Sequence, residues 1–183
     1  MSAAMFGFST MLAHQVSYIQ DLGFSPMLAA LSQSLVSGFS IAGCLGFGIL
    51  ALRFNMRYLA KVSFVVQLLA IVILLTTKNL YLIFLYAALL GLGNGMLMPA
   101  LTALLGAYYG RAPFAKIMGF AFVLILLSQA IAPAAAGAIY DATGKYNTAF
   151  VLVAVLLAIG LACAFMSKQP KATRENKELV RLI

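Results

Sequence analysis

The feature that most limits what this chain can fold into is a set of six long runs without Asp, Glu, Lys or Arg. They cover 1–20, 22–52, 62–77, 79–110, 117–140 and 146–167. A helix crossing a bilayer core of about 30 Å needs roughly 20 residues, because it rises about 1.5 Å per residue. Charged residues make up 9% of the chain and hydrophobic residues 64%, whereas soluble domains contain about 25% charged residues. The runs therefore predict helices that span a lipid bilayer.

We predict an all-α membrane protein with one six-helix transmembrane domain over 1–166 and a basic cytoplasmic tail over 167–183. Five runs reach the length of a span. The run 62–77 reaches it when it is extended back past Lys61, whose side chain can extend to the headgroups. No alternating segments of about 10 residues indicate a membrane β-barrel. The predicted spans lie near 3–20, 27–52, 59–77, 80–107, 117–139 and 147–166.

The basic residues predict how the spans are oriented. With six alternating spans, one side receives only Lys78 and Lys145 among the twelve Lys and Arg residues. The other side receives Arg53, Arg57, Lys61, Arg111, Lys116, Lys168, Lys171, Arg174, Lys177 and Arg181. Basic residues accumulate on the cytoplasmic side of membrane proteins. We therefore expect a multi-pass protein of the cell membrane with both termini in the cytoplasm.

The residues offer little chemistry for an enzyme. One histidine, two distant cysteines and no carboxylate within a span cannot supply the ligands of a metal site. A serine hydrolase needs a serine held in a nucleophile turn beside a base, and the glycine-rich segment 91–95 lacks the strand, helix and lysine of a nucleotide loop. We expect no catalytic residue, no metal and no cofactor. Nucleic acid is not an expected partner, because Glu175 and Glu178 dilute the basic tail.

Uncharged polar side chains recur inside the predicted spans. Gln33, Ser37 and Ser40 follow one face of the second span at i, i+4 and i+7. An unpaired amide in hydrocarbon costs several kcal/mol, so such groups should meet a partner helix or a wet cavity. Hydrogen bonds between helices explain each residue taken singly, whereas the set together favours a cavity lining. The candidates for that lining are His14, Gln15, Tyr18, Gln33, Ser37, Asn94, Ser128 and Gln129.

Glycine and proline occur in the middle of two spans. Gly91 and Gly95 form a small-residue pair four positions apart, with Gly93 between them and Pro99 one turn later. Pro133 lies inside the fifth span. Close contact between helices is one interpretation of these residues. A locally loosened helix beside a substrate path is the other, because transporters break helices at their binding sites.

The loop after the second span carries Gly48, Arg53 and Arg57 at the spacing Gly-x-x-x-x-Arg-x-x-x-Arg. Three further segments lie at the end of the first span, between the fourth and fifth spans, and at the end of the fifth span; they are 14–23, 109–119 and 132–146. In this order the four segments resemble the transporters of the major facilitator superfamily, nearest to the oxalate/formate antiporter and monocarboxylate transporter branch. Gly48, Arg53 and Arg57 match the family signature Gly-x-x-x-Asp-Arg-x-Gly-Arg-Arg, while Leu52 and Asn55 replace its Asp and first later Gly. The other three segments resemble the exit of the family's seventh helix, the loop between its tenth and eleventh helices, and the exit of its eleventh helix.

The resemblance covers the chain up to about Met166 and implies the C-terminal half of a twelve-helix carrier, with six helices arranged as a 3+3 inverted repeat. The segments 48–55 and 137–144 share one spacing after the second and fifth spans, as such a repeat would leave. The resemblance also implies transport of a small solute, such as an organic acid, by alternating access. The expected partners are the lipid bilayer, the solute and a second six-helix half, which is a missing N-terminal half, a separate chain or another copy.

The distribution of charged residues in this chain differs from that in the carriers of this branch. Its carboxylate carriers place basic residues inside the helices equivalent to the second and fifth spans, and here those interiors have none, with Lys116 at the edge. Moving an anion to mid-membrane without a counter-charge is very costly. Either the second half supplies the cation or the substrate is not an anion. The alternative function is that of an integral membrane interaction protein that does not transport.

Overall fold

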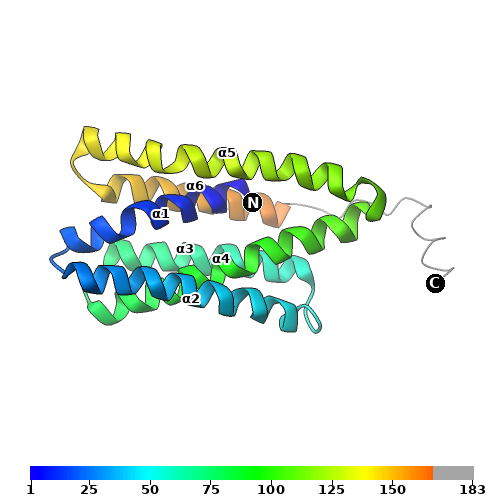
Figure 1. The fold of residues 1–183 in the computed structure, drawn as a ribbon, viewed down its shortest axis with the longest axis horizontal. Coiled ribbons are helices and arrows are strands. Elements are labelled where there is room, and N and C mark those ends of the chain that lie inside the picture. Colours follow the sequence, from blue (N-terminus) through cyan, green and yellow to red (C-terminus); the bar gives the residue numbers. More distant parts are fainter. Residues whose placement is uncertain (167–183) are drawn as a thin grey trace.

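The chain folds into six helices, as Figure 1 shows. The computed structural model describes residues 1–166, except for the side chains of residues 111 and 112. Within this range there is no strand, and the predicted all-α fold is confirmed. The predicted tail, 167–183, lies outside the described residues. The helices are α1 (Ser2–Asp21), α2 (Pro26–Leu50), α3 (Met56–Thr76), α4 (Leu80–Tyr109), α5 (Arg111–Thr143) and α6 (Tyr146–Met166).

Five of these helices, α2 to α6, are long and apolar enough to cross a membrane. Helix α1 has 20 residues, which is enough for a span, but it is more polar because it contains Ser9, Thr10, His14 and Gln15. Large apolar side chains cover the outside of the bundle. Ile41, for example, is 65% exposed on α2. Such a surface is stable in contact with lipid, which the composition requires.

Local capping explains where several helices begin. The side chain of Ser25 accepts a hydrogen bond from the backbone N–H of Leu28 before α2, and Asn79 accepts one from the N–H of Tyr81 before α4. The sequence predicts a break between the fourth and fifth spans, near 80–107 and 117–139. In the structure the break lies at Gly110, whose φ of 70° is accessible to glycine, and α5 begins immediately afterwards. Pro113 falls in the first turn of α5, where its missing N–H removes no helical hydrogen bond.

The helices are arranged around two that lie at the centre of their groups. Helix α4 packs against α2 and α3, and helix α1 packs against α5 and α6. Helices α3 and α6 also contact each other. In Figure 1 the group of α1, α5 and α6 lies above the group of α2, α3 and α4. Each group is therefore made of helices that are not all consecutive in the sequence.

Three glycines of α4 allow neighbouring helices to approach closely. A Cβ atom added at Gly91 or Gly95 would lie well inside 3.0 Å of the backbone of α2, and one added at Gly93 would meet Ser63 and Gln67 of α3. Helix α4 continues without a break through these glycines and through Pro99. Close contact between helices, the first of the two interpretations, therefore describes the glycines in this structure, whereas α4 shows no loosened segment.

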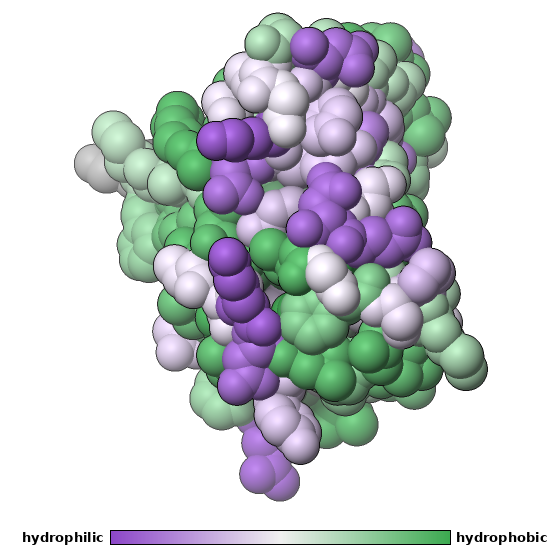
Figure 2. Space-filling view, turned by 90° about the vertical axis from the view of Figure 1, so that its left-hand side faces the viewer, coloured by the Kyte–Doolittle hydropathy of each residue, from purple (hydrophilic) through white to green (hydrophobic). Residues whose placement is uncertain are grey.

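The two ends of the bundle differ in charge. The loops at 21–25, 77–79 and 144–145 lie at one end, where Asp21, Lys78, Asp141 and Lys145 are exposed. Figure 2 faces this end, and hydrophilic residues run across it between apolar flanks. The opposite end has the α2–α3 loop and Gly110, and its charged side chains within the described part of the chain are basic. This division matches the alternation of loops that the sequence predicts.

Candidate functional site

Three polar side chains from three helices form a hydrogen-bonded network inside the bundle. The amide nitrogen Nε2 of Gln15, on α1, donates to Oε1 of Gln33, on α2. The hydroxyl of Tyr86, on α4, donates to Oε1 of Gln15. Gln15 and Tyr86 are fully buried. We call Gln15, Gln33 and Tyr86 the amide–tyrosine network, and it joins both helix groups.

Burial explains why these three side chains are paired. A polar group in an apolar interior costs free energy unless it has a hydrogen-bond partner. Gln15 uses both its donor and its acceptor in the network, whereas Gln33 is only partly buried. Ser37, one turn further along α2, is exposed and donates back to the carbonyl of Gln33. The polar side of α2 therefore runs from the buried network to the surface of the bundle.

His14 and Tyr18 lie on the other side of α1 and contact α5 and α6. The Nε2 atom of His14 lies 3.0 Å from the carbonyl oxygen of Pro133, so this nitrogen carries the proton that it donates. The His14 ring also lies 5.4 Å from that of Tyr146, which is stacked on Tyr140 at 4.1 Å. Tyr18 meets Phe150 edge-on. Neighbouring helical residues differ by about 100° in direction, which is why His14 and Gln15 face different helices.

The remaining candidates are not joined to the network by a hydrogen bond among the described residues. Gln129, on α5, approaches the sulfur of Met5 through Nε2 at 3.3 Å, and Ser128 donates to the carbonyl of Leu124 within its own helix. Oδ1 of Asn94 is buried and has no hydrogen-bond partner within the described residues. The structure therefore brings Gln15 and Gln33 together, places His14, Tyr18 and Gln129 along the contacts of α1 with α5 and α6, and leaves Asn94 apart.

A hydrogen bond from α1 compensates for the proline in α5. Helix α5 continues through Pro133, whose missing N–H leaves the carbonyl of Gln129, four residues earlier, without its helical donor. The hydroxyl of Ser9 donates to this carbonyl at 2.9 Å. Neighbouring Ser and Thr side chains are a known means of satisfying backbone groups that proline frees in membrane helices. Pro133 therefore contributes to the contact of α1 with α5 and does not break α5.

We expect Ser9→Ala to lower the free energy of unfolding by about 1 kcal/mol, because it leaves the partly buried carbonyl of Gln129 without a donor. In a Pro133→Ala background the same change should cost much less, since residue 133 then supplies its own N–H. The measurement is SDS unfolding in detergent micelles of the four proteins in this double-mutant cycle. An equal cost of Ser9→Ala in both backgrounds would show that the hydroxyl does not replace the lost donor.

Sequence reasoning did not select Tyr86 or Gln67. Tyr86 is the one tyrosine of eight that does not lie near a predicted span end, and this difference could have marked it as a candidate. Gln67 is fully buried on α3, and neither polar atom of its amide has a hydrogen-bond partner among the described residues. In the sequence Gln67 is a single amide within an apolar run. This pattern does not by itself distinguish Gln67 from Gln33.

The loop signature places its residues at the basic end. Gly48 and Arg53 are exposed, and Leu52, at the position of the family's Asp, is 86% exposed. Arg57 is partly buried: Nε donates to the hydroxyl of Tyr108, and its guanidinium carbon lies 4.9 Å from the centre of that ring. Arg57 therefore attaches the α2–α3 loop to the end of α4.

Helices of span length, apolar outer surfaces and charges restricted to the two ends define a multi-pass helical membrane protein. The sequence pattern of the Major Facilitator Superfamily matches residues 1–181. The chain belongs to this superfamily, a family of transporters and not of enzymes, and its fold is that of one transporter half.

Two relatives are multi-drug resistance efflux pumps named PmrA, from the TIGR4 and R6 strains of Streptococcus pneumoniae. Each is 26% identical to this chain over 165 residues, which is 88% of the chain and 41% of the pump. Solved structures of a mutant peptide transporter POT, with alafosfalin or sulfate, superpose with a TM-score of 0.81 at 20% identity. They cover 99% of this chain, which spans 41% of theirs. At this identity the likeness concerns the fold.

Proposed function

We propose that the chain is the C-terminal half of a secondary transporter, which moves a small solute through a path shared with a second six-helix unit. The observation that carries the proposal is the family match over 1–181 together with the 41% share of each relative that the chain spans. A fold that accounts for under half of a transporter needs a complement. That complement is an N-terminal half, a separate chain or a second copy.

Helix contacts support a 3+3 inverted repeat as the internal organisation. If α1, α2 and α3 correspond to α4, α5 and α6, the contact of α4 with α2 has its counterpart in that of α1 with α5. The contact of α4 with α3 likewise corresponds to that of α1 with α6. The contact between α3 and α6 is its own counterpart. A pseudo-two-fold repeat requires this exchange of partners.

The solute-binding surface in this proposal combines the amide–tyrosine network with polar side chains that reach the surface of α1 and α2. Ser17 and Gln20 on α1, and Ser34 and Ser37 on α2, are exposed at positions that lipid does not favour. A second six-helix unit covering them would convert the exposed face into a shared path. Asn94 and Gln129 are assigned to the same path.

The charges of the chain limit the solute. In the described residues, Lys, Arg, Asp and Glu are confined to the loops and to the first or last two turns of the helices, so the middle of each helix has no charged side chain. We infer an organic acid as in the oxalate/formate and monocarboxylate branch, with its carboxylate paired to a cation of the second unit. The second candidate is an uncharged or lipophilic solute, which the same lack of charge favours and which suits the relatives named as multi-drug efflux pumps.

We also assign the basic end of the bundle to the cytoplasm and the protein to the cell membrane. Arg53, Arg57 and Lys116 lie at this end, and the end with Asp21 and Asp141 would face outward. Both termini would then be cytoplasmic. This orientation is a proposal from the distribution of charge.

We expect Gln33→Ala, Asn94→Ala and Gln129→Ala each to reduce transport at least about fivefold, because polar groups that orient a solute contribute on the order of 1 kcal/mol or more each. The measurement is transport by membrane vesicles that contain the chain with its second six-helix unit. Radiolabelled formate and lactate test the organic acid, and ethidium tests the lipophilic alternative.

The matched control is Asn147→Ala, which removes an exposed amide at the start of α6. It should leave transport unchanged, and the amount of each variant in the membrane should match the wild type. Normal transport by all three variants would contradict the site assignment. No transport of any probe by the wild-type assembly would favour the interaction protein.

A further inference from the structure

Two basic side chains occupy the first turns of α3, where a helix least favours positive charge. Arg57 and Lys61 stand at i and i+4 and therefore project from the same side of the helix. The N-terminus of a helix carries a partial positive charge, and like charges four residues apart repel each other. No acidic residue lies in the first turn of α3. The two cations are thus placed where an anion would relieve all of these repulsions.

The described residues supply no carboxylate near this pair. Asp21 and Asp141 are the only acidic residues of 1–166, and both lie at the opposite end of the bundle. Nη2 of Arg57 is buried and has no hydrogen-bond partner in this range. Lys61 is held 4.5 Å above the ring of Phe165, and Arg57 lies over that of Tyr108. Cation–π contacts orient both charges without neutralising them.

A cavity of about 290 Å³ lies beside the two charges, and α6 forms part of its wall. Its walls come from α3, α4 and α6, with Met1 at the edge of α1. Arg57, Lys61 and Tyr108 give it a polar side, whereas Phe64, Gly160 and Cys163 give it an apolar side. A second hollow of about 270 Å³ adjoins Arg57 and Tyr108 on the side of the α2–α3 loop. The cavity can therefore admit a group larger than a single water molecule.

A row of exposed apolar side chains continues from Arg57 and Lys61 along α3, toward the middle of the length of this helix. Val65, Leu69 and Val72 follow Lys61 at i+4, i+8 and i+11, so they lie on the same side of the helix. All three are exposed, at 37%, 51% and 44%. A cation at the end of a helix followed by exposed aliphatic side chains matches a lipid headgroup above its acyl chain.

We propose that Arg57 and Lys61 bind the phosphate of an anionic phospholipid, with one acyl chain along Val65, Leu69 and Val72. Basic pockets between transmembrane helices recognise such headgroups. Arg57 has donors suited to phosphate oxygens, and Lys61 adds a point charge. Free phosphate offers the same headgroup chemistry without the acyl chain, so the experiment must separate these two sources. The site lies apart from the amide–tyrosine network and does not depend on the transported solute.

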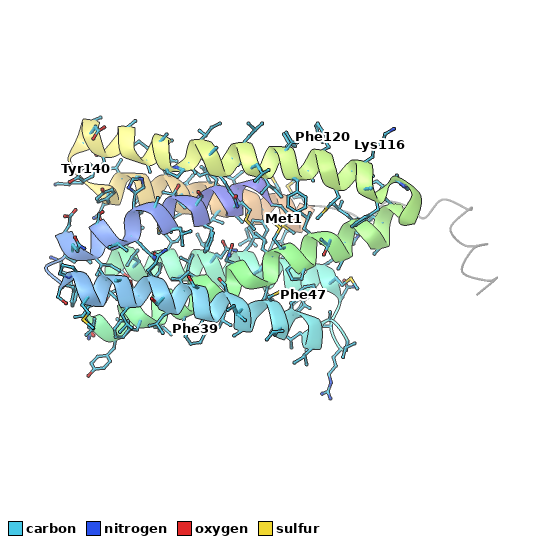
Figure 3. All side chains as sticks on the ribbon, viewed as in Figure 1. Met1, Phe39, Phe47, Lys116, Phe120 and Tyr140 are labelled. Carbon is cyan, nitrogen blue, oxygen red and sulfur yellow. The ribbon has the colours of Figure 1, made fainter. Side chains whose placement is uncertain are left out.

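Native mass spectrometry of the purified chain in neutral detergent tests this proposal. With equal amounts of dioleoyl phosphatidylglycerol and dioleoyl phosphatidylcholine, the phosphatidylglycerol adduct should dominate. Arg57→Gln/Lys61→Gln should reduce that preference on the order of tenfold, since each basic residue near a headgroup adds to binding. The matched control is Arg53→Gln/Lys116→Gln, which removes two charges from the same end. Arg53 is exposed, and Lys116 points outward from α5 (Figure 3).

Several results would overturn the proposal. One is equal binding of the two lipids by the wild-type protein, a comparison that needs no variant to fold. Another is a loss of preference in the control as large as that in the Arg57/Lys61 variant. Displacement of the phosphatidylglycerol by an equal concentration of inorganic phosphate would show a free-anion site. The charge-preserving variant Arg57→Lys/Lys61→Arg should retain the preference, and its loss would also count against the proposal.

Discussion

Replacement of Gly95 by valine is expected to leave most of the protein misfolded. A Cβ atom at this position would overlap the backbone carbonyl of Ser40 and approach the backbone nitrogen of Cys44, both on α2. Backbone atoms of a helix cannot move aside like the end of a flexible side chain, so α2 and α4 must separate. Overpacking of an ordinary core costs about 1–3 kcal/mol, and contact with backbone costs more. We expect a destabilisation of at least about 3 kcal/mol.

Size-exclusion chromatography in detergent measures this effect as the fraction of chain that elutes as a monodisperse peak. Gly46→Val, on α2, is the matched control, because a Cβ atom added at Gly46 meets nothing within 4 Å. Both variants place the same β-branched residue inside a helix, so the intrinsic helix propensity is equal. A Gly95→Val protein as monodisperse and as heat-resistant as the Gly46→Val protein would show that α2 and α4 are not in close contact at Gly95.

The α2–α4 contact shows how far the sequence determines the fold. The runs without charge predict six helices and their alternating loops, because the bilayer fixes the length that a span requires. They do not predict which helices touch, since every apolar face is equally satisfied by lipid. The spacing of Gly91 and Gly95 indicates a close contact but does not name its partner. The structure identifies α2 as that partner and α3 as the neighbour of Gly93.

The candidate site was less predictable than the fold. The sequence identifies polar residues in apolar surroundings, but the direction of each depends on the neighbours of its helix. His14 and Gln15 are adjacent in the chain, yet one meets Pro133 of α5 and the other meets Gln33 of α2. Tyr86 joins the network through its hydroxyl, although a tyrosine inside a span is readily explained as an apolar core residue. The family resemblance indicates which helices line a transport path, but it does not indicate which side chains form hydrogen bonds with each other.

Gln15→Leu is expected to be the most destabilising substitution in the amide–tyrosine network. It leaves Oε1 of Gln33 without its donor and the hydroxyl of Tyr86 without its acceptor, and Tyr86 is fully buried. An orphaned buried polar group costs about 1–3 kcal/mol, so the Tyr86 hydroxyl alone should cost this much, and the partly buried oxygen of Gln33 should add a smaller amount. SDS titration of the protein in detergent micelles measures the loss. Gln20→Leu is the matched control, because Gln20 is an exposed glutamine of the same helix.

The double variant Gln15→Leu/Tyr86→Phe distinguishes the network from simple core filling. Phenylalanine removes the orphaned hydroxyl, so we expect the double variant to be more stable than Gln15→Leu alone by about 1–3 kcal/mol. In the wild-type background Tyr86→Phe should instead destabilise the protein, because it removes the hydroxyl that donates a hydrogen bond to Oε1 of Gln15. This reversal of sign requires a direct interaction between the two side chains. Additive effects, or a Gln15→Leu protein as stable as the Gln20→Leu protein, would show that apolar contacts alone hold α1 against α2 and α4.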